Sequence, residues 1–234
     1  MIKAFNFRSA GKTMVCITLL MTLILVLAGC GGGADQGKAN QDPGTPAAGK
    51  NTEVSKANPL VVDKEAKTVK VYTEVNGKYF VEPTRHGIVF KDGSNGNKSI
   101  LKAYANQNDF YNALIEINAK PGNNLQLTST GVPVEGDKLN VTVTWAGANK
   151  ELPFGEIVTD STNRPFDIRF GGNQQNAKDK NTGCILCLDS CPVGITSNAA
   201  HPTKDFDSGK ARFYGNKDVL PQDGTPVIVT FKVQ

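Results

Sequence analysis

Residues 31–58 limit which part of this chain can fold. Val54 is their only large aliphatic side chain, among mostly Gly, Ala, Asn, Gln, Pro, Lys and Asp. Such a composition cannot bury enough apolar surface to offset the entropy lost on folding. We therefore predict a flexible tether over residues 30–58. The folded part of the 234-residue chain is then residues 59–234, a size typical of one domain.

The first thirty residues have the form of an export signal. Residues 14–28 are uncharged and almost wholly apolar, and three basic residues precede them, Lys3, Arg8 and Lys12. A basic segment followed by a short apolar run is typical of a secretory signal. The run is shorter than the roughly 20 residues that span a bilayer, which disfavours an uncleaved anchor. Residues 1–29 are predicted to be removed.

The sequence at the end of this run, Leu-Ala-Gly-Cys at residues 27–30, resembles the lipobox of bacterial lipoproteins. The resemblance implies that Cys30 carries a diacylglyceryl group and becomes the mature N-terminus. Two or three acyl chains on one residue make membrane attachment effectively stable. The expected location is extracytoplasmic, with the chain lipid-anchored to a bacterial membrane.

The charge distribution and the missing motifs exclude several functions. The formal net charge of +4 is owed mostly to the basic residues of the signal, and no basic stripe interleaved with aromatic residues follows. A nucleic-acid partner is therefore not expected. The sequence contains neither G-x-S-x-G nor H-E-x-x-H, so a hydrolase is disfavoured and an enzyme is the less favoured class.

The hydrophobic pattern predicts an α+β domain. Alternation and β-branched residues favour strands, and Asn76-Gly77 favours a hairpin turn. An apolar face formed by Phe110, Ala113, Leu114 and Ile117 predicts a helix over residues 109–118, and residues 99–104 are a candidate for a second short helix. The fold class is a strand-rich, mostly antiparallel domain with one or two helices. The expected strands are residues 60–62, 68–74, 78–81, 86–90, 138–145, 156–159, 166–170 and 226–233.

Three cysteines form the most informative motif. Cys184, Cys187 and Cys191 have the spacing C-x2-C-x3-C-P. A tight C-x2-C turn can direct two thiolates at one metal ion. The same spacing forms the last three positions of the bacterial ferredoxin motif, whose first cysteine would fall at Asn181. A four-iron (4Fe-4S) cluster here would need a fourth ligand from elsewhere.

The two histidines and the nearby carboxylates are weaker candidates. His201 follows Cys191 by ten residues and can complete a Cys3His zinc site, although Pro-Thr after it favours an exposed loop. His86, at the start of a strand, is expected to be a surface or lightly buried side chain. Three carboxylates match no calcium loop and are expected on solvated turns, namely Asp189, Asp205 and Asp207.

The expected compartment provides an alternative for the cysteines. A chain exported unfolded does not carry a cluster assembled in the cytosol, and thiols outside the membrane tend to oxidise. Two of the three cysteines would then form a disulfide, with no cofactor and one thiol left over. The residues leave metal binding and a disulfide both open.

Four segments together resemble the YdjY family of exported, ferredoxin-like bacterial proteins, namely residues 84–89, 119–124, 170–173 and 184–198. The resemblance covers most of the chain from residue 60 onward. It implies that Cys184, Cys187 and Cys191 ligate an iron–sulfur cluster. The expected function is a membrane-tethered lipoprotein that binds iron–sulfur or zinc and transfers electrons to a redox partner protein. The alternative is a non-enzymatic surface binding module in which the cysteines form a disulfide staple.

Overall fold

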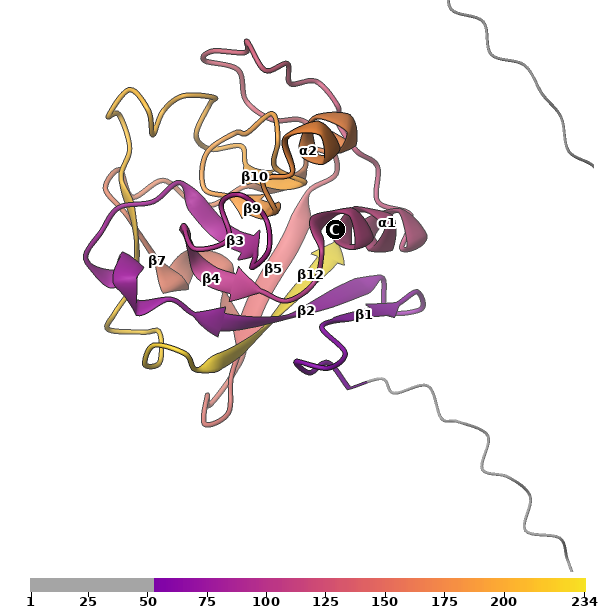
Figure 1. Cartoon of the computed structure of the whole chain (residues 1–234), viewed down its shortest axis with the longest axis vertical. Coiled ribbons are helices and arrows are strands. Elements are labelled where there is room, and N and C mark those ends of the chain that lie inside the picture. The colour runs from indigo at the N-terminus through magenta and orange to yellow at the C-terminus, as the bar shows by residue number, and fades with distance from the viewer. Residues whose placement is uncertain (1–52) are drawn as a thin grey trace, which may run out of the picture. The chain divides into compact units, whose positions relative to one another are not determined.

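The structure, a computed structural model, describes residues 53–234 (Figure 1). The predicted signal, the lipidation site at Cys30 and most of the predicted tether lie outside the described residues. The last tether residues already touch the domain, because Lys56 forms an ion pair with Glu74 at 2.9 Å. Lys56 also lies 4.6 Å from the ring centroid of Tyr104.

Two α-helices and two short 3-10 helices accompany twelve strands in the described residues. The helices are α1 (Gln107–Glu116), α2 (Gln174–Lys180), η1 (Gly77–Phe80) and η2 (Phe154–Ile157). The strands are β1 (Leu60–Asp63), β2 (Thr68–Val75), β3 (His86–Phe90), β4 (Ser99–Ala103), β5 (Leu139–Thr144), β6 (Leu152–Pro153), β7 (Val158–Asp160), β8 (Ile168–Phe170), β9 (Cys184–Cys187), β10 (Thr196–Asn198), β11 (Phe213–Gly215) and β12 (Pro226–Val233).

Ten of the strands form one curled sheet. Its order is β6-β5-β12-β2-β4-β3-β9-β10-β8, with β1 paired beside β2, while β7 and β11 form a separate two-stranded sheet. All pairs are antiparallel except β3 with β4 and β9 with β10. A bridge between Lys138 and Arg169 brings β8 back to the start of β5, so the sheet nearly closes on itself. The α+β, mostly antiparallel prediction is confirmed.

The core forms where the two longest strands meet helix α1. In β2 and β12 every second side chain is buried, including Val71, Val229 and Phe231, as expected for strands with one face toward a core. Helix α1 packs Phe110 against Phe231 with ring centroids 4.7 Å apart. The side chain of Asn106 caps the helix by accepting a hydrogen bond from the backbone N–H of Asn108.

Three local predictions were wrong. Residues 78–80 belong to η1 and Val81 caps it, so no strand forms at 78–81; Tyr79 turns inward and its hydroxyl donates to the carbonyl of Asn97 at 2.9 Å. Residues 99–103 form β4 rather than a helix. The prediction failed because a central strand is buried on both faces, so its short apolar sequence cannot be told from that of a buried helix. Helix α2 was not expected, since it buries only Ala177.

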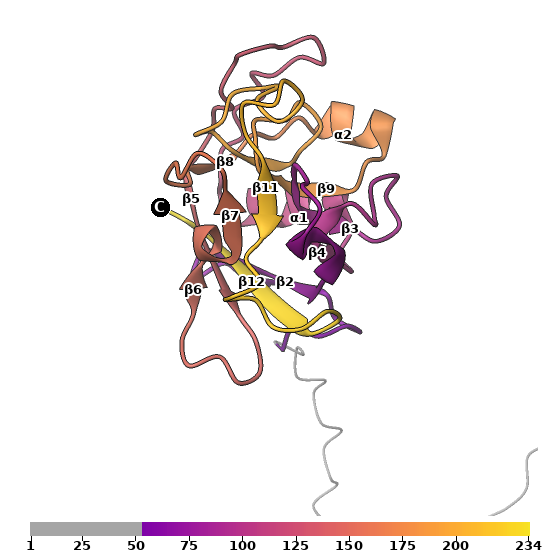
Figure 2. The same cartoon turned by 90° about the vertical axis from the view of Figure 1, so that its left-hand side faces the viewer.

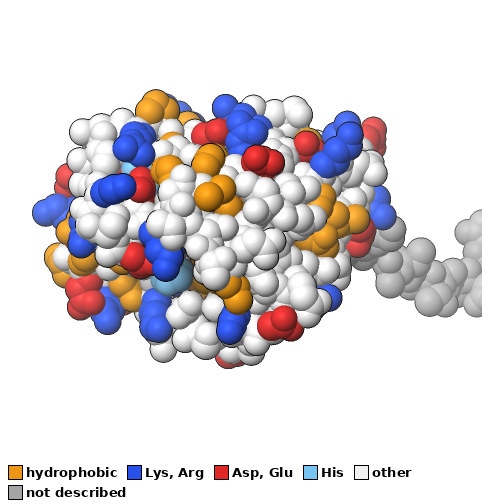
Figure 3. All heavy atoms as spheres, turned by 90° about the horizontal axis from the view of Figure 1, so that it is seen from above, with side chains coloured by type: hydrophobic (Ala, Val, Ile, Leu, Met, Phe, Trp, Pro, Cys, Tyr) orange, Lys and Arg blue, Asp and Glu red, His pale blue; other side chains and the backbone are white. Residues whose placement is uncertain are grey.

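The surface shows mixed charge on the side drawn in Figure 3, where basic and acidic side chains are interspersed. Within residues 53–234, no helix is both long and apolar enough to cross a membrane.

The inner face of α1 is predicted to carry much of the stability of the domain. Leu114 is fully buried, whereas its neighbour Ile115 is 42% exposed on the same helix. Replacing Leu114 with Ala leaves a cavity, so we expect Leu114→Ala to lower the free energy of unfolding by about 2–5 kcal/mol. Ile115→Ala, the matched control, should cost less than about 1 kcal/mol. Urea unfolding of both variants measures the difference, and equal losses would contradict this packing.

Candidate metal centre

The three cysteines lie together in a small buried cluster with Val89, separate from the main core. Cys184 and Cys187 are the two ends of β9, and both are fully buried. The C-x2-C segment is therefore a strand and not the tight turn expected from its spacing. It is extended because β3 pairs with it on one side and β10 on the other (Figure 1). All three cysteines are free thiols, so the disulfide staple is not formed in this structure.

Two register shifts between β3 and β9 place the cysteines on one face. Residues three apart in a regular strand point to opposite faces of the sheet. Here His86 pairs with Cys187, Ile88 with Leu186 and Val89 with Cys184. Each strand thus contributes one extra residue, Gly87 in β3 and Ile185 in β9, as in a β-bulge. Cys184 and Cys187 consequently point the same way, toward the side occupied by His86.

Gly87 allows this irregular pairing because it has no side chain. A Cβ atom at this position would lie 2.6 Å from Cδ2 of Leu186 and 3.1 Å from Cδ2 of Leu188, both fully buried side chains. A larger residue here would have to displace these two buried leucine side chains.

The ligand atoms of His86, Cys184 and Cys187 all lie within 4.8 Å of one another. Nδ1 of the half-buried His86 is 3.5 Å from Sγ of Cys184. Among residues 53–234 this is the one group of three or more His, Cys, Asp or Glu side chains that converges in this way. Cys191 packs in the same buried cluster, but it is not one of the three converging ligands.

The pKa values of the two strand thiols shift in opposite directions. The hydrogen bond from Cys187, followed by that from His86, lowers the pKa of Cys184 well below its ordinary value, although burial opposes this. Hydrogen bonds with Cys184 and Cys191, together with burial, raise the pKa of Cys187. Of the two thiols, Cys184 is therefore the one more easily deprotonated. The thiolate is the form of cysteine that binds metal ions.

The loop from Cys191 to Gly194 covers the cluster, and helix α2 holds the loop in place. At the start of α2, the buried side-chain amide of Asn173 donates to the carbonyls of Cys191 and Gly194, at 3.2 and 3.4 Å. Figures 1 and 2 both show α2 beside β9. A Cβ atom at Gly194 would lie 3.0 Å from Sγ of Cys187. From the other side, the amide of Asn95 lies 3.9 Å from Sγ of Cys184.

A buried ion pair adjoins the site. The guanidinium of Arg85, the residue before His86, donates to both carboxylate oxygens of Asp189 at 2.8 and 2.9 Å, and to Asp207 at 3.1 Å. Asp189 is fully buried, so its expected place on a solvated turn was wrong, whereas Asp207 is half exposed. Burial lowers the pKa of Arg85, but the charge of Asp189, together with smaller contributions from Cys191, Cys187 and Asp207, outweighs it and the net shift is upward. Burial also raises the pKa of Asp189, against the effect of Arg85.

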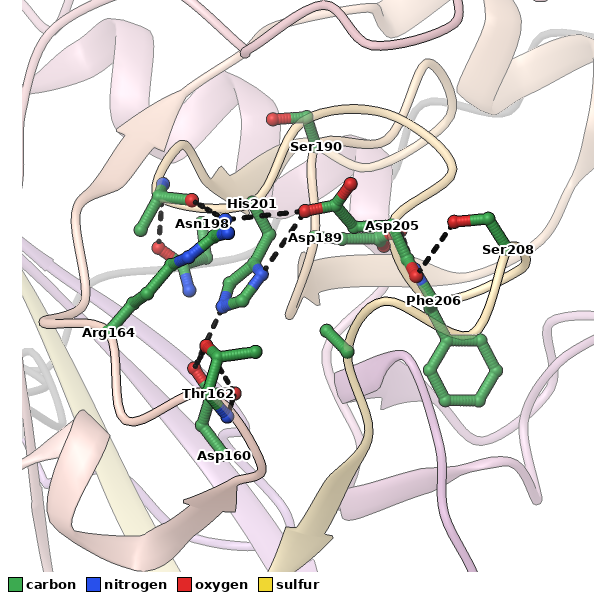
Figure 4. A network of polar contacts seen from close by, with 12 residues as sticks. Asp160, Thr162, Arg164, Asp189, Ser190, Asn198, His201, Asp205, Phe206 and Ser208 are labelled. Atoms are coloured by element: carbon green, nitrogen blue, oxygen red, sulfur yellow. Dashed lines mark hydrogen bonds and ion pairs between the residues drawn. The ribbon is translucent and has the colours of Figure 1, made fainter.

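The structure places His201 in a separate polar network (Figure 4). Its Nε2 lies 2.8 Å from Oδ2 of Asp160, and its Nδ1 lies 3.5 Å from Oδ2 of Asp205, which Arg164 also contacts at 3.4 Å. His201 is fully buried and Asp205 nearly so, so their expected exposure was wrong. Both ring nitrogens face carboxylates, and His201 does not belong to the converging group.

His86 is the site residue that sequence reasoning missed. It lies at the start of a strand and is half buried, as expected, but its ring faces Cys184. The contact joins residues 98 positions apart, so no local pattern contains it. The glycine that follows His86 is the one local signal of a close approach by another strand.

These features define a strand-rich α+β domain with a buried cysteine–histidine site. The YdjY domain family matches residues 60–232, and the chain belongs to that family. It is 46% identical over 182 residues to YdjY of Escherichia coli (strain K12), described as an uncharacterized protein, covering 77% of this chain and 81% of the relative. No solved structure matches the chain.

The Arg85–Asp189 pair is predicted to stabilise the loop that follows the cysteines. Removing the guanidinium leaves the buried carboxylate of Asp189 without its charge partner. Arg85→Met is therefore expected to lower the free energy of unfolding by about 3–5 kcal/mol. The control is Lys91→Met, because Lys91 pairs with Asp92 in an exposed contact and should contribute less than about 1 kcal/mol. Denaturant titration compares them, and a loss below 1 kcal/mol for Arg85→Met would refute this role.

Proposed function

We propose that this domain binds one zinc-like metal ion through His86, Cys184 and Cys187. The observation that carries the proposal is the 3.5 Å separation between Nδ1 of His86 and Sγ of Cys184. Zinc binds thiolate at about 2.3 Å and imidazole at about 2.0–2.1 Å, so two such ligands at a tetrahedral angle are about 3.6 Å apart. The pair therefore already has the spacing that a bound zinc ion requires.

The chemistry of the donors supports the same assignment. Two thiolates and one imidazole form a soft donor set that favours zinc over magnesium or calcium. Burial of both cysteines excludes solvent from most of the site. Three protein ligands leave one tetrahedral position open, for water or a small ligand.

The arrangement favours a single ion over an iron–sulfur cluster. In a four-iron cluster each thiolate binds its own iron atom, so the cysteines are spread around the cluster. Here two sulfurs and a ring nitrogen converge within 4.8 Å. Electron transfer to a redox partner remains tied to the cluster hypothesis, which the ferredoxin-like spacing and the family resemblance suggest. The experiment below separates the two.

We further propose that the domain works outside the cytoplasm, tethered to a bacterial membrane by lipid on Cys30. The proposal rests on the apolar run, the Leu-Ala-Gly-Cys sequence at residues 27–30 and the low-complexity segment that follows. A tether of about thirty flexible residues has an r.m.s. reach of about 30 Å, which would hold the metal centre close to the membrane surface.

Metal content tests the first proposal. We expect the full chain, purified without chelators, to contain stoichiometric zinc by elemental analysis and to show no visible charge-transfer band. The variants His86→Ala, Cys184→Ser and Cys187→Ser should each lose stoichiometric zinc, because each removes one ligand. Cys191→Ser, the matched control, should retain it. Thermal unfolding of each variant checks that the fold survives.

Two results would contradict the zinc proposal. Stoichiometric iron with a broad visible band would favour the cluster and the electron-transfer function. If Cys191→Ser lost zinc as fully as the three ligand variants, Cys191 would also be a ligand, and the three-ligand assignment would be overturned.

Cell fractionation tests the lipid anchor. The unaltered chain, expressed in a bacterium, should partition into the detergent phase of a membrane extract and incorporate labelled fatty acid. Cys30→Ser should incorporate none, because the acylated thiol is gone, while Cys16→Ser should behave like the unaltered chain. Equal labelling of both variants would show that Cys30 is not the lipidated residue.

A further inference from the structure

We propose that Cys191 is a reaction site for small anionic disulfides and that Cys187 resolves the adduct to form a Cys187–Cys191 disulfide. The consequence for metal binding rests on the proposed function, whereas the thiol reaction itself does not. The proposal assigns a role to the one cysteine that the metal site leaves unused.

Access distinguishes Cys191 from the other two cysteines. Cys184 and Cys187 are 0% exposed, whereas Cys191 is 4% exposed and lines a pocket of about 170 Å³. The same pocket is bordered by Arg85, Leu127, Val193 and Lys204. A reagent in the pocket therefore reaches Cys191 first.

The pocket also selects by charge. Lys204 contributes a cationic group to its lining, whereas the guanidinium of Arg85 is already paired with Asp189 and Asp207. Asp207 also lines it, but its carboxylate is paired with Arg85 at 3.1 Å. A cationic group beside a thiol favours a reagent that carries carboxylates.

The second thiol needed for a disulfide is already in contact with the first. Cys187 packs with Cys191 in the same small buried cluster. Cys184 lies on the far side of Cys187, beside His86. Cys187 is therefore the resolving residue, and Cys184 takes no part.

The chemistry is thiol–disulfide exchange in two steps. The Cys191 thiolate attacks one sulfur of the reagent R–S–S–R, forms Cys191–S–S–R and expels one thiolate RS⁻. Cys187, having lost its proton, then attacks Sγ of Cys191 and expels the second RS⁻. Two electrons pass from the cysteines to the reagent, which leaves as two thiolates RS⁻, and the two cysteine protons pass to the solvent.

Formation of this disulfide removes one ligand from the metal site. Cys187 is one of the three side chains that converge on the ion, so its oxidation leaves only His86 and Cys184. Two ligands hold zinc far more weakly than three, and the ion is released. Reduction of the disulfide restores the site.

Thiol counting with dithiobis(nitrobenzoate), an anionic aromatic disulfide, tests the reaction. We use the full chain in detergent, with Cys16 and Cys30 replaced by serine, so that only the three clustered cysteines remain. The reduced chain should release two reagent thiolates and retain no adduct by mass spectrometry. Cys187→Ser should release one and keep the adduct, and Cys184→Ser should still release two. Cys191→Ser should react at least about tenfold more slowly, since the buried thiols need local opening.

Rate comparisons test the selection by charge. Lys204→Gln should slow the reaction with the anionic reagent by about threefold to fivefold and leave that with neutral dithiodipyridine unchanged. Lys210, which is also exposed but does not line the pocket, provides the control Lys210→Gln. Equal effects of the two lysine variants would refute the anionic preference.

The outcomes separate this inference from the metal proposal. Slow reaction of Cys191→Ser in a chain that binds no zinc supports the thiol site and refutes the metal site. Zinc binding with equal reaction rates in Cys191→Ser and the parent chain overturns the thiol site alone. If zinc is bound, a zinc-sensitive dye should detect its release at the same rate as the second reagent thiolate appears. Retention of zinc in the chain with the Cys187–Cys191 disulfide would overturn the link between disulfide formation and zinc release.

Discussion

The irregular pairing of β3 with β9 is the constraint on which the candidate site depends. In a regular ladder Cys184 and Cys187 would point to opposite faces of the sheet, and His86 would share a face with only one of them. One extra residue in each strand, Gly87 and Ile185, returns all three side chains to the same face. The site is therefore a property of strand register, and the absence of a side chain at Gly87 permits that register.

The segment after β9 is stabilised by buried polar pairs as well as by apolar packing. Arg85 holds Asp189 beside the cysteines, and Asp160 holds His201 further along the chain. Each pair links this irregular segment to an element far away in the sequence. A segment with little regular secondary structure needs such contacts, because an unpaired buried charge is costly. The Arg85–Asp189 pair in particular lies next to the loop that covers the cysteine cluster.

The sequence predicted the parts of the fold that follow a local period. Strands β2 and β12 bury every second side chain, and α1 carries an apolar face, so each was found within a few residues. Strand β4 is buried on both faces and was mistaken for a helix. The cysteines were found from their spacing, but His86 was not, because its contact with Cys184 spans 98 positions. His201 was placed on the surface because the pairing with Asp160 leaves no local signal.

The number and kind of metal ligands decide whether this account is correct. X-ray absorption at the zinc edge of the zinc-loaded chain measures both directly. The account predicts two sulfur neighbours at about 2.3 Å and one imidazole nitrogen at about 2.0–2.1 Å, with a light atom in the fourth position. A shell of three sulfur atoms, or no imidazole signal, would contradict the central claim that His86, Cys184 and Cys187 bind the ion.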